Sequence, residues 1–173
     1  MGPKWWSYAP LVAMPLAMAP VYAQPVSTPK WEYDSGVMSI DDIPYRTACL
    51  FSTNTKYFSN SRDEENLAFC IRYSKADEGG IGIMITTSGH GKKFACGENQ
   101  NCPVKLKFDS NPSFASPGVL AKDDPGDMIF IDNRSIVGNV RASSKMRIQA
   151  DTATDGIAVF DFDVRGLNLE PTK

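Results

Sequence analysis

The chain has 173 residues, with 18 Lys and Arg against 20 Asp and Glu, one His and four Cys. This length suits one domain and argues against two full ones. The near-neutral charge excludes a generally basic nucleic-acid-binding protein, and the hydrophobic fraction of 42% excludes a disordered or collagen-like chain. A single His leaves almost no room for His-based metal sites.

Residues 1–23 have the pattern of a secretory signal peptide. Lys4 is the only charge in this stretch, and the apolar run that follows is interrupted by three prolines, which disfavour a membrane-spanning helix. Small or apolar residues precede the bond between Ala23 and Gln24, so we expect cleavage there. The alternative is an uncleaved anchor. We therefore expect a single exported β domain over residues 24–173 that does not span a membrane after cleavage.

Alternation of apolar and polar residues, which is typical of strands with one buried face, predicts five strands in chain order. Their apolar faces are formed by Leu67, Phe69, Ile71 and Tyr73, by Ile81, Ile83 and Ile85, by Val104, Leu106 and Phe108, by Met146 and Ile148, and by Ala158, Phe160, Phe162 and Val164. Asp132-Asn133 followed by residues 134–142 predicts one short helix with a polar cap. The fold class is therefore mainly β, either an antiparallel β-sandwich or a curled sheet, with one short helix.

The four cysteines of an exported chain predict two disulfides. Of the three pairings, we favour Cys49–Cys70, because the apolar segments around them can lie side by side. We also favour Cys96–Cys102, which encloses a polar turn between two strand-like runs. The alternative is a four-cysteine zinc site, but the usual pairs in such sites are two to four residues apart and the closest pair here has five residues between its members.

Familiar catalytic and metal-binding loops are not matched. Residues 89–93 lack the Gly and the Ser or Thr that a phosphate-binding loop needs. Residues 123–127 carry carboxylates without the spacing of an EF-hand. Ser88 and His90 are close neighbours on a Gly-rich turn, and nothing in the sequence marks an acid that would orient the His.

Asp161 and Asp163 share one face of a predicted strand, roughly 6.5–7 Å apart. That separation is near the range used by inverting glycosidases. However, both lie opposite the apolar face formed by Phe160 and Phe162, so we interpret them as solvated carboxylates. We expect no catalytic residue, no cofactor and no metal site.

Lys92, Lys93, Lys105 and Lys107 flank the presumed Cys96–Cys102 loop, and the last two share one face of a predicted strand. If Lys92 or Lys93 joins them across a hairpin, a positive patch forms on an otherwise acidic chain. Such a patch could hold an anionic partner, so these four lysines are the candidate binding residues. The alternative is a solvated face that guards an edge strand.

Short motifs follow one another in a distinctive order: Trp31, ACLFSTN at 48–54, LAFCIR at 67–72, FAC at 94–96, CPV at 102–104, KFD at 107–109 and FDFDVRGL at 160–167. This order resembles a group of small exported bacterial envelope proteins, mostly of unknown function, with the layout W…SxN…(I/L)R…FxC…CxVx(V/L)(R/K)FD…FxFxVxGL. The ending is similar to that of type VI secretion-associated envelope proteins. Cys49 and Cys70 are additions to the layout, and no Trp follows Leu167.

The resemblance implies a Gram-negative periplasmic location, a Cys96–Cys102 bridge and no catalytic residues. We expect a periplasmic, non-enzymatic binding or accessory protein with a protein partner in the envelope and no nucleic-acid partner. The resemblance implies a secretion or conjugation apparatus as its setting. One alternative is a periplasmic inhibitor or immunity protein against a toxin or cell-wall hydrolase, and another is a small hydrolase that uses Asp161 and Asp163.

Overall fold

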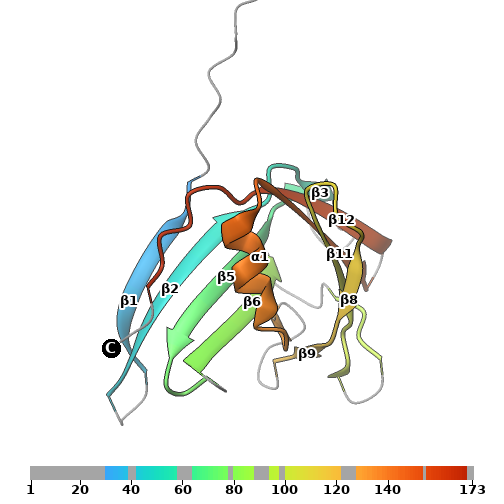
Figure 1. Cartoon of the computed structure of the whole chain (residues 1–173). Coiled ribbons are helices and arrows are strands. Elements are labelled where there is room, and N and C mark those ends of the chain that lie inside the picture. The colour runs from blue at the N-terminus through green and yellow to red at the C-terminus, as the bar shows by residue number, and fades with distance from the viewer. Residues whose placement is uncertain are drawn as a thin grey trace, which may run out of the picture.

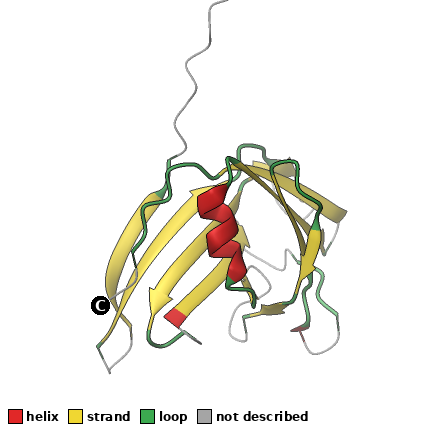
Figure 2. Ribbon diagram, in the orientation of Figure 1, coloured by secondary structure: helices red, strands yellow, loops and turns green. Residues whose placement is uncertain are grey.

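The computed structural model describes residues 30–38, 42–57, 64–77, 80–87, 94–97, 100–121, 128–153 and 155–170. The predicted signal peptide lies outside these ranges. Within them the chain is mainly β, with two antiparallel sheets that share one core and a single short helix (Figures 1 and 2). The predicted fold class is confirmed.

The strands are arranged in one larger and one smaller sheet. The larger has the order β1 (Glu32–Met38), β2 (Ile43–Phe51), β5 (Leu67–Ser74), β6 (Ile81–Thr87), β10 (Met128–Ile131) and β9 (Gly118–Leu120). The smaller has the order β12 (Gly156–Asp163), β11 (Lys145–Thr152), β7 (Val104–Phe108) and β8 (Phe114–Ser116). A short additional pair consists of β3 (Lys56–Tyr57) and β4 (Glu64–Glu65). The five strands predicted from the sequence are β5, β6, β7, β11 and β12.

The core lies between the inner faces of the two sheets. Phe69 of β5 contacts Trp31 and Phe162 of β12 edge-to-face, with ring centroids 6.4 and 6.3 Å apart. Val104, Leu106 and Phe108 bury one side of β7 in the same core, as their alternation predicts. Phe94 is fully buried as well. Burying a large apolar side chain in this way contributes about 1.5–3 kcal/mol.

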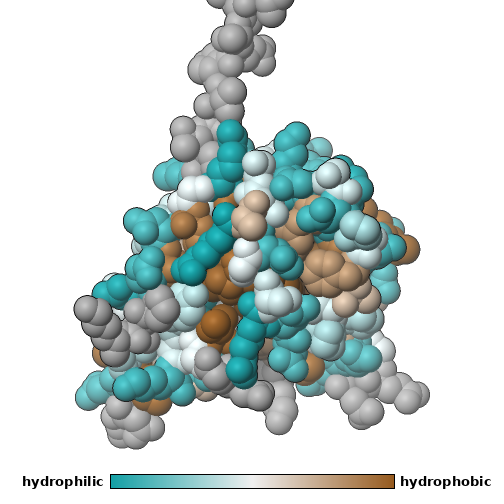
Figure 3. All heavy atoms as spheres, viewed as in Figure 1, coloured by the Kyte–Doolittle hydropathy of each residue, from teal (hydrophilic) through white to brown (hydrophobic). Residues whose placement is uncertain are grey.

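The helix α1 (Ser135–Ala142) packs Ile136, Val137 and Val140 into the same core. The N-cap residue is Arg134, which makes no capping side-chain bond, while the side-chain oxygen of the preceding Asn133 accepts the backbone N–H of Ser135 at 3.2 Å. The helix begins one residue later than expected. On the face of the molecule that carries α1, hydrophobic surface gathers at the centre and hydrophilic side chains surround it (Figure 3).

Both favoured disulfides are present. Cys49 and Cys70 lie directly opposite each other in the β2–β5 register, so their bridge joins neighbouring strands. Cys96 and Cys102 close a short loop before β7. All four sulfurs are therefore committed to S–S bonds, and the four-cysteine zinc alternative does not apply.

The arms of the Cys96–Cys102 loop do not form the hairpin that the sequence suggested. Phe94 bridges to Thr152 at the end of β11, and the Ala95 N–H donates to the carbonyl of Asp151 at 2.9 Å. β7 pairs with β11 and β8. Both arms thus add to the smaller sheet through β11, and among the described residues they do not pair with each other as strands.

A short segment after β2 connects the two sheets. The Thr53 N–H donates to the carbonyl of Asp161 on β12 at 2.7 Å. The Asn54 side chain donates to the carbonyl of Val159 at 3.0 Å and accepts the N–H of Asp161 at 2.7 Å. Ser52 connects the segment to the larger sheet, because its hydroxyl accepts the N–H of Leu67 on β5. The SxN motif therefore links β5 to β12.

The chain after β12 turns back toward β1. Gly166 has a φ of +80°, a conformation that glycine adopts readily and that lets the chain turn sharply. The Trp31 indole N–H donates to the carbonyl of Arg165 at 3.0 Å, and the Tyr33 hydroxyl accepts the N–H of Asn168 at 2.9 Å. Leu169 is buried in the core. These contacts fix the C-terminal segment against the larger sheet.

Candidate functional site

The outer face of the smaller sheet carries the predicted Lys105 and Lys107. Both are exposed, while Val104, Leu106 and Phe108 between and beside them are buried. The arrangement follows from the period of two residues in a strand. The prediction that these two lysines share one exposed face is confirmed. Lys92 and Lys93 lie outside the described residues.

Strand β11 extends this face with two cations that the sequence analysis did not single out. Lys145 and Arg147 are exposed, opposite the buried Met146 and Ile148. In the register of the two strands, Arg147 lies directly across from Lys107. We call Lys105, Lys107, Lys145 and Arg147 the cation face. The alternation of β11 contained the signal for its two members, but the pairing of β11 with β7 was not predictable.

Lys105 and Lys107 lie on a solvated face, as the alternative interpretation expected, but they do not guard an edge strand. β7 has β11 on one side and β8 on the other, so it is an inner strand. Two cations directly opposite each other on neighbouring strands repel and destabilise a sheet. Arg147 relieves part of this repulsion, because its Nε donates to Asp161 Oδ1 on β12 at 2.7 Å. Among the described residues, Lys105 and Lys107 have no ion pair.

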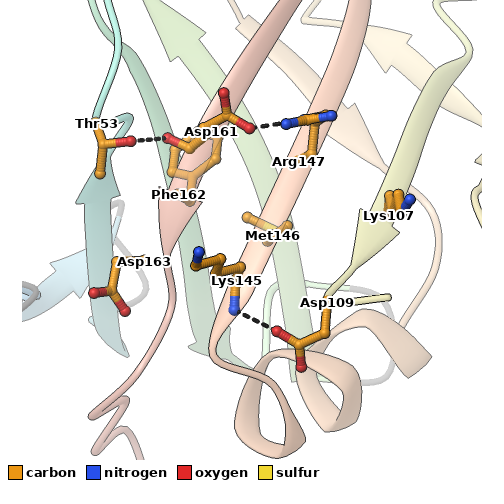
Figure 4. A pocket seen from close by; sticks show the side chains of 9 residues that line it. All are labelled: Thr53, Lys107, Asp109, Lys145, Met146, Arg147, Asp161, Phe162 and Asp163. Atoms are coloured by element: carbon orange, nitrogen blue, oxygen red, sulfur yellow. Dashed lines mark hydrogen bonds and ion pairs between the residues drawn. The ribbon is translucent and has the colours of Figure 1, made fainter. Parts of the chain in front are cut away.

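The cation face borders a shallow depression of about 520 Å³ (Figure 4). Its lining comes from β7, β11, β12 and the segment after β2, and consists of Thr53, Lys107, Asp109, Lys145, Met146, Arg147, Asp161, Phe162 and Asp163. Figure 4 shows the polar side chains of these strands on the near side of the sheet, around the depression. Cations and carboxylates are therefore both present, and what each one already contacts decides what the depression can hold.

All three carboxylates of the depression have partners. Asp161 contacts Arg147, and Asp109 accepts the backbone N–H groups of Ser144 and Lys145, the latter at 2.8 Å. Asp163 accepts Arg165 Nε at 2.8 Å. The ammonium group of Lys107 has no such partner within the described part of the chain, whereas Lys145 lies across from Asp163 on β12 and interacts with its carboxylate electrostatically. The unsatisfied group is a donor with positive charge, which suits an anion.

The pKa of the Asp163 carboxyl is lowered, chiefly because the Arg165 guanidinium donates hydrogen bonds to its charged form. The same contact raises the pKa of Arg165. A general acid in a glycosidase needs a carboxyl with a raised pKa, so the shift at Asp163 has the wrong direction for that role. Asp161 and Asp163 thus act as partners of Arg147 and Arg165, which agrees with their interpretation as solvated carboxylates.

No family model matches the chain, and no curated protein is significantly similar to it. Among solved structures, it is similar to a crystal structure of invasion associated protein B from Bartonella henselae. The sequence identity is 13% and the TM-score is 0.42, over 79% of this chain and 89% of the other. A similarity at this level says nothing about function.

Two properties bear on where the chain works. Disulfides form and persist in oxidising compartments, so the two bridges indicate a location outside the cytoplasm. Within the described ranges, no helix is both long and apolar enough to cross a membrane.

Proposed function

We propose that this protein is a non-enzymatic binding protein of the bacterial cell envelope, which holds an acidic surface of a protein partner against its cation face. The observation that carries the proposal is the alignment of Lys105, Lys107 and Arg147 on paired strands, although cations in these positions repel each other. An acidic partner removes this repulsion on binding. Lys145 adds a fourth charge beside the depression.

The rigidity of the scaffold supports a binding role. β7 and β11 are inner strands of the smaller sheet, and their opposite sides are buried in the core. The cations therefore project from a fixed backbone, which lowers the entropy cost of association. Single exposed ion pairs contribute about 0.2–1 kcal/mol each, so the four charges give moderate affinity together with faster, salt-dependent encounter.

The proposed location is the periplasm. It rests on the predicted signal peptide at residues 1–23 and on the two disulfides. The resemblance to envelope proteins makes a secretion or conjugation apparatus the proposed setting, with the partner being one of its subunits.

Photo-crosslinking in cells of the source organism tests the proposal. Ala115 on β8 is exposed and lies opposite Lys105, so a photoreactive residue at position 115 samples the cation face without replacing a cation. We expect an adduct with one envelope protein whose contact surface is acidic. The adduct is lost in Lys105→Glu/Lys107→Glu.

The matched control is Lys30→Glu/Lys75→Glu, which changes the net charge equally at exposed positions that are not on the cation face. It should keep the adduct. Equal yields of the adduct in Lys105→Glu/Lys107→Glu and in Lys30→Glu/Lys75→Glu would contradict the proposal. The absence of any adduct in the chain that keeps all four cations would also contradict it. If the captured partner is a toxin or a cell-wall hydrolase, the inhibitor alternative replaces the apparatus subunit.

A further inference from the structure

The larger sheet ends at β1, whose outer edge is exposed along its length. Residues 32–37 are all exposed, with Val37 at 60% and Tyr33 at 49%. Figure 1 shows β1 as the outermost strand of this sheet. An edge strand presents unpaired backbone N–H and C=O groups that can pair with another extended chain.

The other sheet edges of the described chain are short or covered. Thr53 and Asn54 bond to the backbone of Asp161 and Val159 along β12. β8 and β9 have three residues each, and the Cys102 N–H also donates to the carbonyl of Gly118 in β9. β1 has seven residues, and the C-terminal segment contacts it through the Tyr33 hydroxyl, while no described backbone group bonds to its outer edge.

β1 also lacks three features that often protect an edge, namely a bulge, a Pro and a Lys, and the charges it does carry are the acids Glu32 and Asp34. Its register with β2 is continuous from Glu32↔Cys49 to Met38↔Ile43, without a bulge. The strand contains no Pro and no Lys. Proteins commonly use Pro, Lys or a bulge to stop pairing at such an edge. β1 is therefore open to strand addition.

The charges of β1 define what can pair with it. Glu32 and Asp34 lie on one face of the strand, and their neighbours on β2 are the uncharged Cys49 and Thr47. Asp34 accepts the Tyr45 hydroxyl at 3.0 Å, and neither acid has an ion pair among the described residues. Tyr33 and Val37 supply exposed apolar surface on the opposite face. The edge therefore carries acids on one side and apolar groups on the other.

We propose that β1 binds an extended segment of a partner protein by strand addition, and that this segment carries Lys or Arg at every second position with apolar residues between. The basic side chains lie beside Glu32 and Asp34, and the apolar ones lie beside Tyr33 and Val37. Backbone hydrogen bonds supply affinity, and the alternating side chains supply specificity. A second copy of this chain fits less well, because two paired β1 edges bring four carboxylates onto one face.

This surface is on the larger sheet and takes basic partners, so it is independent of the cation face. The probe is a capped eight-residue peptide that alternates Lys and Val, with a peptide alternating Glu and Val as its counterpart. Hydrogen exchange is measured on the full, disulfide-bonded chain. We expect the Lys–Val peptide to slow exchange of every second amide within residues 32–38, and the Glu–Val peptide to leave these amides unchanged.

Charge reversal gives the decisive variant. Glu32→Lys/Asp34→Lys should weaken binding of the Lys–Val peptide roughly tenfold and should make the Glu–Val peptide bind instead. Glu32→Gln/Asp34→Asn, which removes the charges with less risk to folding, should weaken binding of the Lys–Val peptide without making the Glu–Val peptide bind. Unchanged exchange of the β5 amides verifies the fold of each variant.

Two controls separate strand addition from general attraction of a basic peptide. Asp132→Lys/Asp151→Lys reverses two exposed acids away from β1 and should leave binding intact, as should Lys105→Glu/Lys107→Glu. The proposal is overturned if the Lys–Val peptide protects no β1 amide, or if the Asp132/Asp151 variant loses binding equally. It is also overturned if β1 amides are protected by self-association that Val37→Lys abolishes.

Discussion

Gly166 follows β12 and has a φ of +80°, whereas Gly138 lies within α1. No atom lies within 4 Å of the position that a Cβ would take at either residue. A methyl group at these sites therefore changes only the backbone preference. Left-handed φ costs a residue with a side chain about 1–2 kcal/mol, while Ala in a helix is favoured over Gly by about 0.8–1 kcal/mol.

The same chemical change should consequently have opposite effects at the two glycines. Gly166→Ala is expected to lower the free energy of unfolding by about 1 kcal/mol, and Gly138→Ala is expected to raise it by about 0.5–1 kcal/mol. Urea unfolding of the two variants beside the parent chain measures both. A loss of stability at Gly138 would show that the helix needs glycine for a reason other than conformation.

Asp163 gives stability a specific pH dependence. Its folded-state pKa lies below the ordinary value of 3.8, because Arg165 bonds to the charged form. The ion pair therefore contributes stability above about pH 4, and this contribution disappears as the pH falls through the lowered pKa. We expect Asp163→Asn to be less stable than the parent at pH 6, with the difference shrinking as the pH falls below about 4.

The matched background is Arg165→Gln, which removes the largest cause of the shift and leaves the smaller contribution of Lys145. In that background Asp163→Asn should produce little pH-dependent change, as measured by urea unfolding between pH 2 and 6. A pH-dependent difference that persists without Arg165 would assign the stabilisation to another group.

Among the elements, the segment from Ser52 to Asn54 has a disproportionate role. The side chain of Asn54 pairs with β12 in the way that a neighbouring strand's backbone would. A buried or half-buried hydrogen bond contributes about 0.5–1.5 kcal/mol. Because Asn54 makes two such bonds, Asn54→Ala should lower the free energy of unfolding by about 2 kcal/mol.

Thr53→Val is the control for this prediction. It removes an exposed hydroxyl that donates to the Asp161 carbonyl and leaves the backbone N–H bond in place. Its cost should be below about 0.5 kcal/mol, the usual size for a surface substitution. Equal losses in the two variants, measured by denaturant unfolding, would refute the role given to Asn54.

The elements also show how far the sequence could predict the fold. β7 and β12 were predictable because each buries one face, so their apolar residues alternate. β5 is buried on both faces, but its largest apolar side chains still stand at every second position. β1 could not be predicted this way, because it is exposed along nearly its whole length. β10 is only four residues long and apolar throughout, so it shows no period that marks a strand.

The candidate site was half predictable for a related reason. Lys105 and Lys107 share a strand, so local alternation placed them on one face. Lys145 and Arg147 join them only through the pairing of β11 with β7, across nearly 40 residues of sequence. Strand pairings between residues so far apart in sequence are set by how the whole core packs. The hairpin assigned to the Cys96–Cys102 loop was wrong for the same reason, because both arms pair with β11.

For the molecule as a whole, the two disulfides differ in the length of chain that they close. Cys49 and Cys70 are 21 residues apart, whereas Cys96 and Cys102 are 6 apart. The loop-entropy model assigns about 3.4 kcal/mol to the longer loop and about 2.4 kcal/mol to the shorter. Replacing Cys49 and Cys70 together by Ala should therefore destabilise the chain more than replacing the other pair.

Urea unfolding of the two double-alanine variants tests this order, with the reduced parent chain as the reference that lacks both bridges. Thiol titration of the unreduced parent should detect no free thiol. A larger loss from the Cys96/Cys102 pair would mean that this loop positions β7 for packing, beyond its effect on the unfolded chain.

The central claim is that four cations on β7 and β11 bind an acidic surface. Its most direct test is the dissociation constant for the partner captured at position 115, measured across a range of salt concentrations with purified proteins. The account predicts that binding weakens as salt rises, that Lys105→Glu/Lys107→Glu loses at least about tenfold in affinity at low salt, and that Lys30→Glu/Lys75→Glu loses little. Equal affinities in the two double variants, or binding insensitive to salt, would contradict it.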